Sequence, residues 1–133
     1  MLTGIIVQTV VRELNIKGDI MKGLIIKPKW ANLILDGKKT IEVRGSKTNI
    51  RGTIGIIESG SKKVFGTANL LRCSEMTYSS FIECRDEHKL EITYTELLKI
   101  YPKPYMWWLV DIKRYDIPVA YEHKQGCVIW VNI

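Results

Sequence analysis

The residues best suited to chemistry lie in one short run, residues 37–45, which reads GKKTIEVRG. If residues 40–44 form a strand, Thr40, Glu42 and Arg44 point to the same side, because side chains alternate across a strand. Lys39 stands directly before that face. These groups are costly to bury, so they favour a strand face that lines a wet cleft. The simpler alternative is the solvated face of an edge strand.

The charges in this run suggest two kinds of chemistry. Glu42 is expected to hold Lys39 or Arg44 by a charge-assisted hydrogen bond. A lysine becomes a nucleophile or base when burial or nearby cations lower its pKa, and Lys38 and Arg44 are the nearby cations here. Glu42 acts in the opposite direction, because it favours the charged form of Lys39. The same cluster could stabilise negative charge during RNA cleavage, but the sequence assigns no general base for that reaction.

The surrounding stretch of chain is strongly basic. The protein has 133 residues and a net charge of +6, with 20 basic and 14 acidic residues. Residues 22–72 hold eleven basic and three acidic residues, so this segment carries more positive charge than the whole chain. Such asymmetry favours binding to nucleic acid, a nucleotide or an anionic surface, and the alternative is a solvated basic face that keeps the protein soluble.

Composition excludes several classes of protein. Hydrophobic residues make up 46% and charged residues 26% of the chain, which is typical of one globular domain. No apolar run approaches the ~20 residues of a membrane span, so no membrane partner is expected. Three cysteines do not form a disulfide framework, which predicts a cytoplasmic protein. Cys84 with His88, and His123 with Cys127, resemble zinc spacing only in outline, and we predict neither a metal nor a cofactor.

Turn and periodicity signals predict about six strands and two to three short helices. Pro28 suits the first turn of a helix, and Gly37 suits the left-handed position after its end. Thr93 and Glu96 match a capping box at the start of another helix. The predicted strands span residues 23–27, 40–44, 53–58, 64–72, 105–111 and 126–133, and the predicted helices begin near residues 28, 77 and 93. Short strands separated by turns indicate a small barrel with helices inserted around it.

The first residues do not fit this pattern. Met21 is followed at once by the first predicted strand, and the four residues before it could be encoded by a purine-rich ribosome-binding sequence. We therefore expect Met21 to be the true start codon of a bacterial or phage gene. The chain then divides into an N-terminal extension, residues 1–21, and the domain, residues 22–133. The competing interpretation is a short extra strand or helix packed on the domain.

The run 37–45 contains the pattern G-x-K-x-x-E-x-R, which resembles that of the ASCH (activating signal cointegrator homology) family of the PUA-like superfamily. Similar segments precede it at residues 27–31 and follow it at 64–68, 107–110 and 118–123, so the resemblance covers about residues 22–131. It implies an α+β fold, a small PUA-like β-barrel, with a cleft beside the motif. RNA or nucleotide binding is the usual proposal for that cleft.

We expect the ligand face to combine the motif with nearby basic and aromatic residues. Trp107 and Trp108 are adjacent in a predicted strand, so they face opposite sides, and one must leave the core side. That ring could stack on a base, although packing under a helix is the alternative. The candidate nucleic-acid-binding residues are Lys27, Lys29, Lys38, Lys39, Thr40, Glu42, Arg44 and Trp108.

The resemblance also implies an alternative, a hydrolase of N-acylated cytidine or RNA. One group of ASCH proteins hydrolyses acylated cytidine with a Lys, a Thr and a Glu. The Lys falls on Lys39, which would be the active group, but the Thr falls on Glu42, and the Glu falls on Leu90 with Glu91 beside it. Glu42 and Glu91 are therefore candidate catalytic residues only if the protein is an enzyme. A third possibility is a protein-interaction module, whose partners the sequence does not indicate.

Overall fold

The computed structural model describes residues 21–133. The predicted N-terminal extension lies outside the described residues except for Met21. The described chain forms one mixed sheet of six strands in the order β2-β5-β4-β3-β1-β6. β1 runs parallel to β3, and the other neighbouring pairs are antiparallel. The strands are β1 (Lys22–Ile26), β2 (Ile41–Arg44), β3 (Gly52–Glu58), β4 (Lys63–Glu75), β5 (Tyr105–Ala120) and β6 (Trp130–Asn132).

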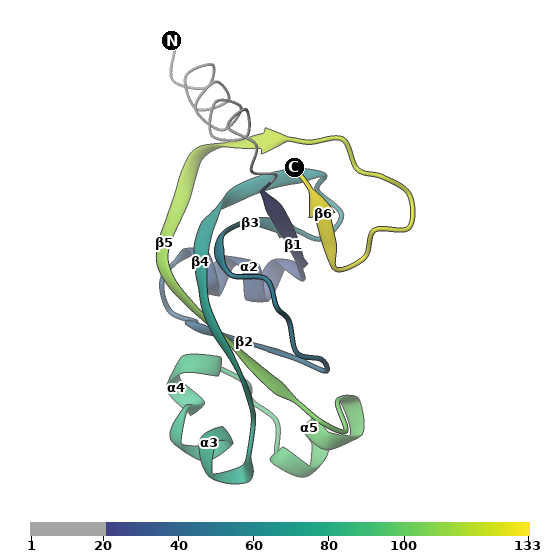
Figure 1. Ribbon diagram of the computed structural model, residues 1–133. Coiled ribbons are helices and arrows are strands. Elements are labelled where there is room, and N and C mark those ends of the chain that lie inside the picture. Colours follow the sequence, from purple (N-terminus) through teal and green to yellow (C-terminus); the bar gives the residue numbers. More distant parts are fainter. Residues whose placement is uncertain (1–20) are drawn as a thin grey trace.

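The sheet curls into a half-barrel around helix α2 (Pro28–Leu35) (Figure 1). Pro28 occupies the first turn of this helix, and Gly37 follows its end with a φ of 76°, as the sequence predicts. The apolar side of the helix packs on the concave side of the sheet, where it completes the main core. The fully buried members of that core include Leu24, Ile34, Ile54, Ile56 and Leu70.

The long strands β4 and β5 extend beyond this half-barrel and carry a separate helical layer. That layer contains α3 (Tyr78–Glu83), α4 (Arg85–His88) and α5 (Tyr94–Ile100), all between β4 and β5 in the chain (Figure 1). Thr77 and Thr93 form capping boxes at the starts of α3 and α5, and the second of these confirms the sequence prediction. A second core joins the layer to the sheet and contains Ile41, Val43, Met76, Phe81, Leu97 and Met106.

The predicted fold class, a small α+β barrel of about six strands, is confirmed in the form of this curled half-barrel. The structure differs from the prediction in three places. It contains α4, whose four residues are too short for a periodic signal. β5 continues to Ala120 rather than ending at residue 111, and irregularities in its pairing with β4 accompany this length. The last strand spans only Trp130–Asn132. Among residues 21–133, no helix has the length and apolar character needed to cross a bilayer.

Candidate nucleic-acid interface

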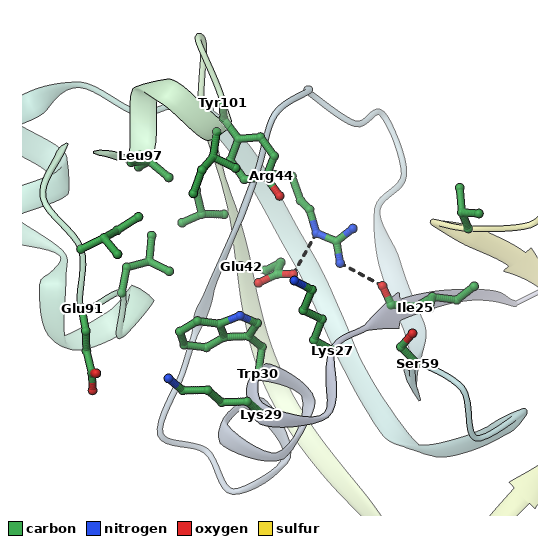
Figure 2. Close-up of a pocket in the computed structure, with 15 residues that line it drawn as sticks. Ile25, Lys27, Lys29, Trp30, Glu42, Arg44, Ser59, Glu91, Leu97 and Tyr101 are labelled. Atoms are coloured by element: carbon green, nitrogen blue, oxygen red, sulfur yellow. Dashed lines mark hydrogen bonds and ion pairs between the residues drawn. The ribbon is translucent and has the colours of Figure 1, made fainter. Parts of the chain in front are cut away.

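A cleft of about 670 Å³ lies between the half-barrel and the helical layer (Figure 2). Its size falls in the range of pockets that bind small ligands. β2 supplies Glu42 and Arg44 to it, because this edge strand lies where the two layers meet. The chain around the start of α2 contributes Lys27, Lys29 and Trp30, and the opposite wall includes Glu91, Leu97 and Tyr101.

Glu42 and Arg44 form an ion pair in this cleft. The Arg44 Nε donates to Glu42 Oε2 over 2.8 Å, and Arg44 Nη2 donates to the backbone oxygen of Ile25 over 3.0 Å (Figure 2). The two side chains are only 6% and 17% exposed, so the pair is well shielded from water. Period-two alternation places Ile41 and Val43 in the second core, as the predicted strand requires. Arg44 thereby ties β2 to β1 beside the cleft.

Lys39 lies behind Glu42, fully buried. Its ammonium group donates to the backbone oxygen of His88 over 2.5 Å and lies 3.7 Å from Glu42 Oε1. The same nitrogen is 4.8 Å from the centre of the Trp30 ring. Burial lowers the pKa of Lys39 to about 8, and the nearby Glu42 carboxylate opposes that change. Lys39 is therefore a buried amine that can lose its proton, rather than an exposed cation at the open face. It lies beside two residues of the cleft, Glu42 and Trp30.

The other predicted ligand residues separate into two groups. Lys27 and Lys29 are exposed and line the cleft, and Lys29 Nζ lies 4.7 Å from the centre of the Trp30 ring. Lys38 is exposed but does not line the cleft. Thr40 is half-buried, and its backbone joins Glu87 and Leu109 by hydrogen bonds. The motif thus brings Glu42 and Arg44 to the cleft and leaves Lys38 and Thr40 beside it.

Trp107 and Trp108 face opposite sides of β5, as predicted, and Trp108 follows the alternative of packing under the helical layer. Trp107 is 2% exposed in the main core, behind Arg44. Trp108 faces the opposite side and packs against the second core, which the sequence did not reveal. Its Nε1 donates to Ser74 Oγ over 3.0 Å, and the Arg72 guanidinium lies 4.2 Å from its ring centre. Trp108 does not line the cleft.

Several residues of the cleft were not predicted. Ser59, Ile92, Ile100 and Tyr101 line it, and Trp30 lines it as well. These residues belong to segments far apart in the chain, so no local pattern marks them. The capping box at Thr93 predicted the helix but not the surface it faces.

Both nitrogens of the His88 ring form hydrogen bonds within the helical layer. Its Nε2 lies 2.8 Å from the Phe81 backbone oxygen, and its Nδ1 lies 3.0 Å from the Leu90 backbone nitrogen. A carbonyl only accepts and a backbone N–H only donates, so the ring is neutral with its proton on Nε2. Both ring nitrogens already have partners, so the Cys84–His88 spacing reflects a structural histidine in α4.

The family model for the ASCH domain matches residues 24–119. The chain belongs to the ASCH domain family. An ASCH protein from Zymomonas mobilis has a similar fold, with a TM-score of 0.63 and 17% identity over 85% of this chain and 87% of that one. A serine-to-alanine variant of that protein gives a TM-score of 0.61 at 18% identity over the same shares. A tyrosine-to-phenylalanine variant gives 0.59 at 19% identity, over 77% of this ASCH chain and 76% of that one. No curated protein sequence matches the chain.

Proposed function

We propose that this ASCH protein is an RNA- or nucleotide-binding module and that the cleft above the Glu42–Arg44 pair is its ligand site. Membership of the ASCH family supports a PUA-like RNA-binding module at the level of the family. The observation that carries the proposal for this chain is the composition of the cleft. Exposed cations at one rim, a shielded ion pair beneath and a mainly apolar wall opposite, which includes Tyr101, suit a ligand that is both anionic and aromatic.

The phosphate and the base of a nucleotide each have a matching group in the cleft. Lys27 and Lys29 are free to contact phosphate, since both are exposed at the rim. The ring of Tyr101 offers an apolar surface for a base. Arg44 donates to Glu42 Oε2, and the Lys39 ammonium lies 3.7 Å from Oε1. A carboxylate oxygen has two lone pairs, so Oε1 keeps the capacity to accept a hydrogen bond from a base amino group.

Fluorescence anisotropy with a labelled single-stranded RNA of eight nucleotides tests this proposal. Affinity should fall with salt by about 0.7 log units per log unit of salt for each phosphate neutralised. Replacing both Lys27 and Lys29 by Gln should weaken binding roughly tenfold and flatten the salt dependence. Lys113→Gln is the matched control, because Lys113 is exposed on β5 and does not line the cleft. A salt-independent affinity would contradict backbone binding.

The state of Lys39 favours one alternative, hydrolysis of N-acylated cytidine or of RNA. A pKa of about 8 leaves a fraction of the amine neutral near physiological pH, as a nucleophile or base requires. In this alternative Lys39 is the active group, although it is fully buried behind Glu42 and does not line the cleft. Glu42 and Glu91 line the cleft and are the carboxylates available for proton transfer. Amide hydrolysis would consume water and release cytidine and a carboxylic acid.

Incubation with N-acylated cytidine and with short RNAs separates the two functions. Release of cytidine, followed by chromatography, or RNA cleavage, followed on gels, would select the enzyme. Lys39→Met should then abolish turnover while preserving the side-chain volume. Binding without turnover would select the binding module.

A further inference from the structure

A second cavity of about 250 Å³ adjoins the cleft. Ile25, Ser59 and Val128 line both, so the two form one continuous groove across the end of β1. Figure 2 shows Ile25 and Ser59 on the far side of the Arg44 guanidinium from Leu97 and Glu91. Arg44 also donates to the Ile25 backbone oxygen, so it stands at the junction of the two cavities.

The chemistry of the second cavity differs from that of the first. Lys62 is an exposed cation in its lining, and Ser59 adds a hydroxyl group. Among the described residues, neither an aspartate nor a glutamate lines it, whereas Glu42 and Glu91 line the first. A cation and hydroxyl groups without a carboxylate suit an anionic group such as a phosphate.

Tyr121 and His123 form a fixed pair in the wall of the same cavity. The Tyr121 hydroxyl lies 2.9 Å from His123 Nδ1, and the two rings meet edge to face with centroids 5.8 Å apart. Burial raises the pKa of Tyr121, which keeps its hydroxyl protonated. The pair therefore presents polar groups and aromatic edges next to Lys62, a combination that suits the phosphate and sugar of a nucleotide.

We propose that the second cavity is a subsite for the phosphate of an adjacent nucleotide, so that the groove binds an RNA chain of at least two nucleotides. This inference rests on the proposed function, in which the first cleft receives one nucleotide. Lys62 contacts the phosphate that joins the nucleotide in the first cleft to the next nucleotide. Tyr121 and His123 position that phosphate. A free nucleoside monophosphate fills only the first cleft and does not contact the Tyr121–His123 pair.

The test compares the affinity of two probes for the full chain. The probes are the four nucleoside 5′-monophosphates, measured by calorimetry, and a labelled single-stranded RNA of eight mixed nucleotides, measured by anisotropy. Lys62→Gln should weaken RNA binding about five- to tenfold and make the salt slope about 0.7 shallower, the share of one phosphate. Monophosphate binding should change less than twofold.

Two further variants complete the design. Tyr121→Phe removes one hydroxyl group and should also weaken RNA binding more than monophosphate binding. This variant tests the subsite without substituting Lys62, whose φ of 56° makes substitution there less safe. Lys113→Gln should leave both affinities unchanged, because Lys113 lines neither cavity.

Equal losses for both probes, or no loss for either, would overturn the subsite while leaving the first cleft intact. Failure of both RNA and the monophosphates to bind the unmodified protein would overturn the proposed function and the subsite together. Monophosphate binding without RNA binding would overturn the subsite alone.

Discussion

The Lys39 ammonium donates a hydrogen bond of 2.5 Å to the backbone oxygen of His88, which is 49 residues further along the chain. This contact joins the corner before β2 to the end of α4, so it ties the motif to the helical layer that forms one wall of the cleft. The amine is desolvated there, and Trp30 and Glu42 lie beside it. Stability, ionisation and ligand binding should therefore be coupled at this residue.

Replacing Lys39 should reveal the cost of its buried charge. The folded pKa of about 8 lies below the ordinary lysine value of 10.5, so the unfolded chain binds more protons between these values. The free energy of unfolding of the unmodified protein should therefore rise with pH from about 8 to 10.5, relative to Lys39→Met. Urea unfolding at a series of pH values measures this difference.

The size of the side chain supplies a control for Lys39. Lys39→Ala should cost about 2–4 kcal/mol, since it leaves a cavity that Lys39→Met largely fills. Lys38→Met is the matched control, because Lys38 is the exposed neighbour of Lys39. It should change neither the free energy of unfolding nor its pH dependence. A parallel pH dependence in Lys39→Met and the unmodified protein would show that Lys39 does not titrate as stated.

His88 should make the helical layer sensitive to acid. Burial lowers the pKa of His88, and its neutral Nδ1 accepts from the Leu90 N–H. Below the ordinary value of 6.5 the unfolded chain binds the proton first, so stability should fall as the pH drops through that value. Hydrogen exchange of the Leu90 amide, followed by NMR, should lose protection in the same range.

Removing the imidazole checks the assignment to His88. His88→Gln should be less stable at pH 7, by roughly 1–3 kcal/mol for the lost buried hydrogen bonds, and less dependent on acid. His123→Gln should retain the acid dependence of the unmodified protein. Equal acid sensitivity in His88→Gln would assign the effect to other groups.

Glu42→Gln should distinguish a binding module from an enzyme. In a binding module the change weakens the contact to Arg44 and should reduce ligand affinity by about 1–2 kcal/mol. In an enzyme that uses Glu42 for proton transfer, affinity should survive and turnover should fall roughly 100-fold or more. Affinity from calorimetry and turnover from product release, measured on the same preparation, give both quantities. Ligand binding and turnover that both remain unchanged would end the assignment of this motif to a site.

The capping box at Thr93 should support the wall of the cleft. Thr93 Oγ1 accepts from the Glu96 N–H over 3.1 Å, and Glu96 Oε1 accepts from the Thr93 N–H over 3.2 Å. Thr93→Ala should cost about 1 kcal/mol of unfolding free energy, measured by urea titration, because the Glu96 N–H loses its partner and the Glu96 carboxylate loses the Thr93 hydroxyl donor. Thr95→Ala, in the exposed first turn of the same helix, should cost little or nothing. Equal effects at the two positions would contradict a role for the cap.

Local signals in the sequence determined most of the elements of this protein. Pro28 and Gly37 bound α2, the Thr93–Glu96 box begins α5, and alternation in residues 40–44 places Glu42 and Arg44 on one face. These features depend on backbone geometry and on neighbours a few residues away, so they can be read from the chain. The motif also identified the family, which the match over residues 24–119 confirms.

The tertiary structure alone decided which side chains are buried and which share the cleft. Lys39 precedes a polar strand face, yet α4 and Trp30 cover it, and its pKa falls as a result. Trp108 faces away from the cleft onto the second core, which exists only because β4 and β5 extend to carry three helices. Burial depends on segments that are distant in sequence and meet only on folding, and no local pattern encodes that meeting.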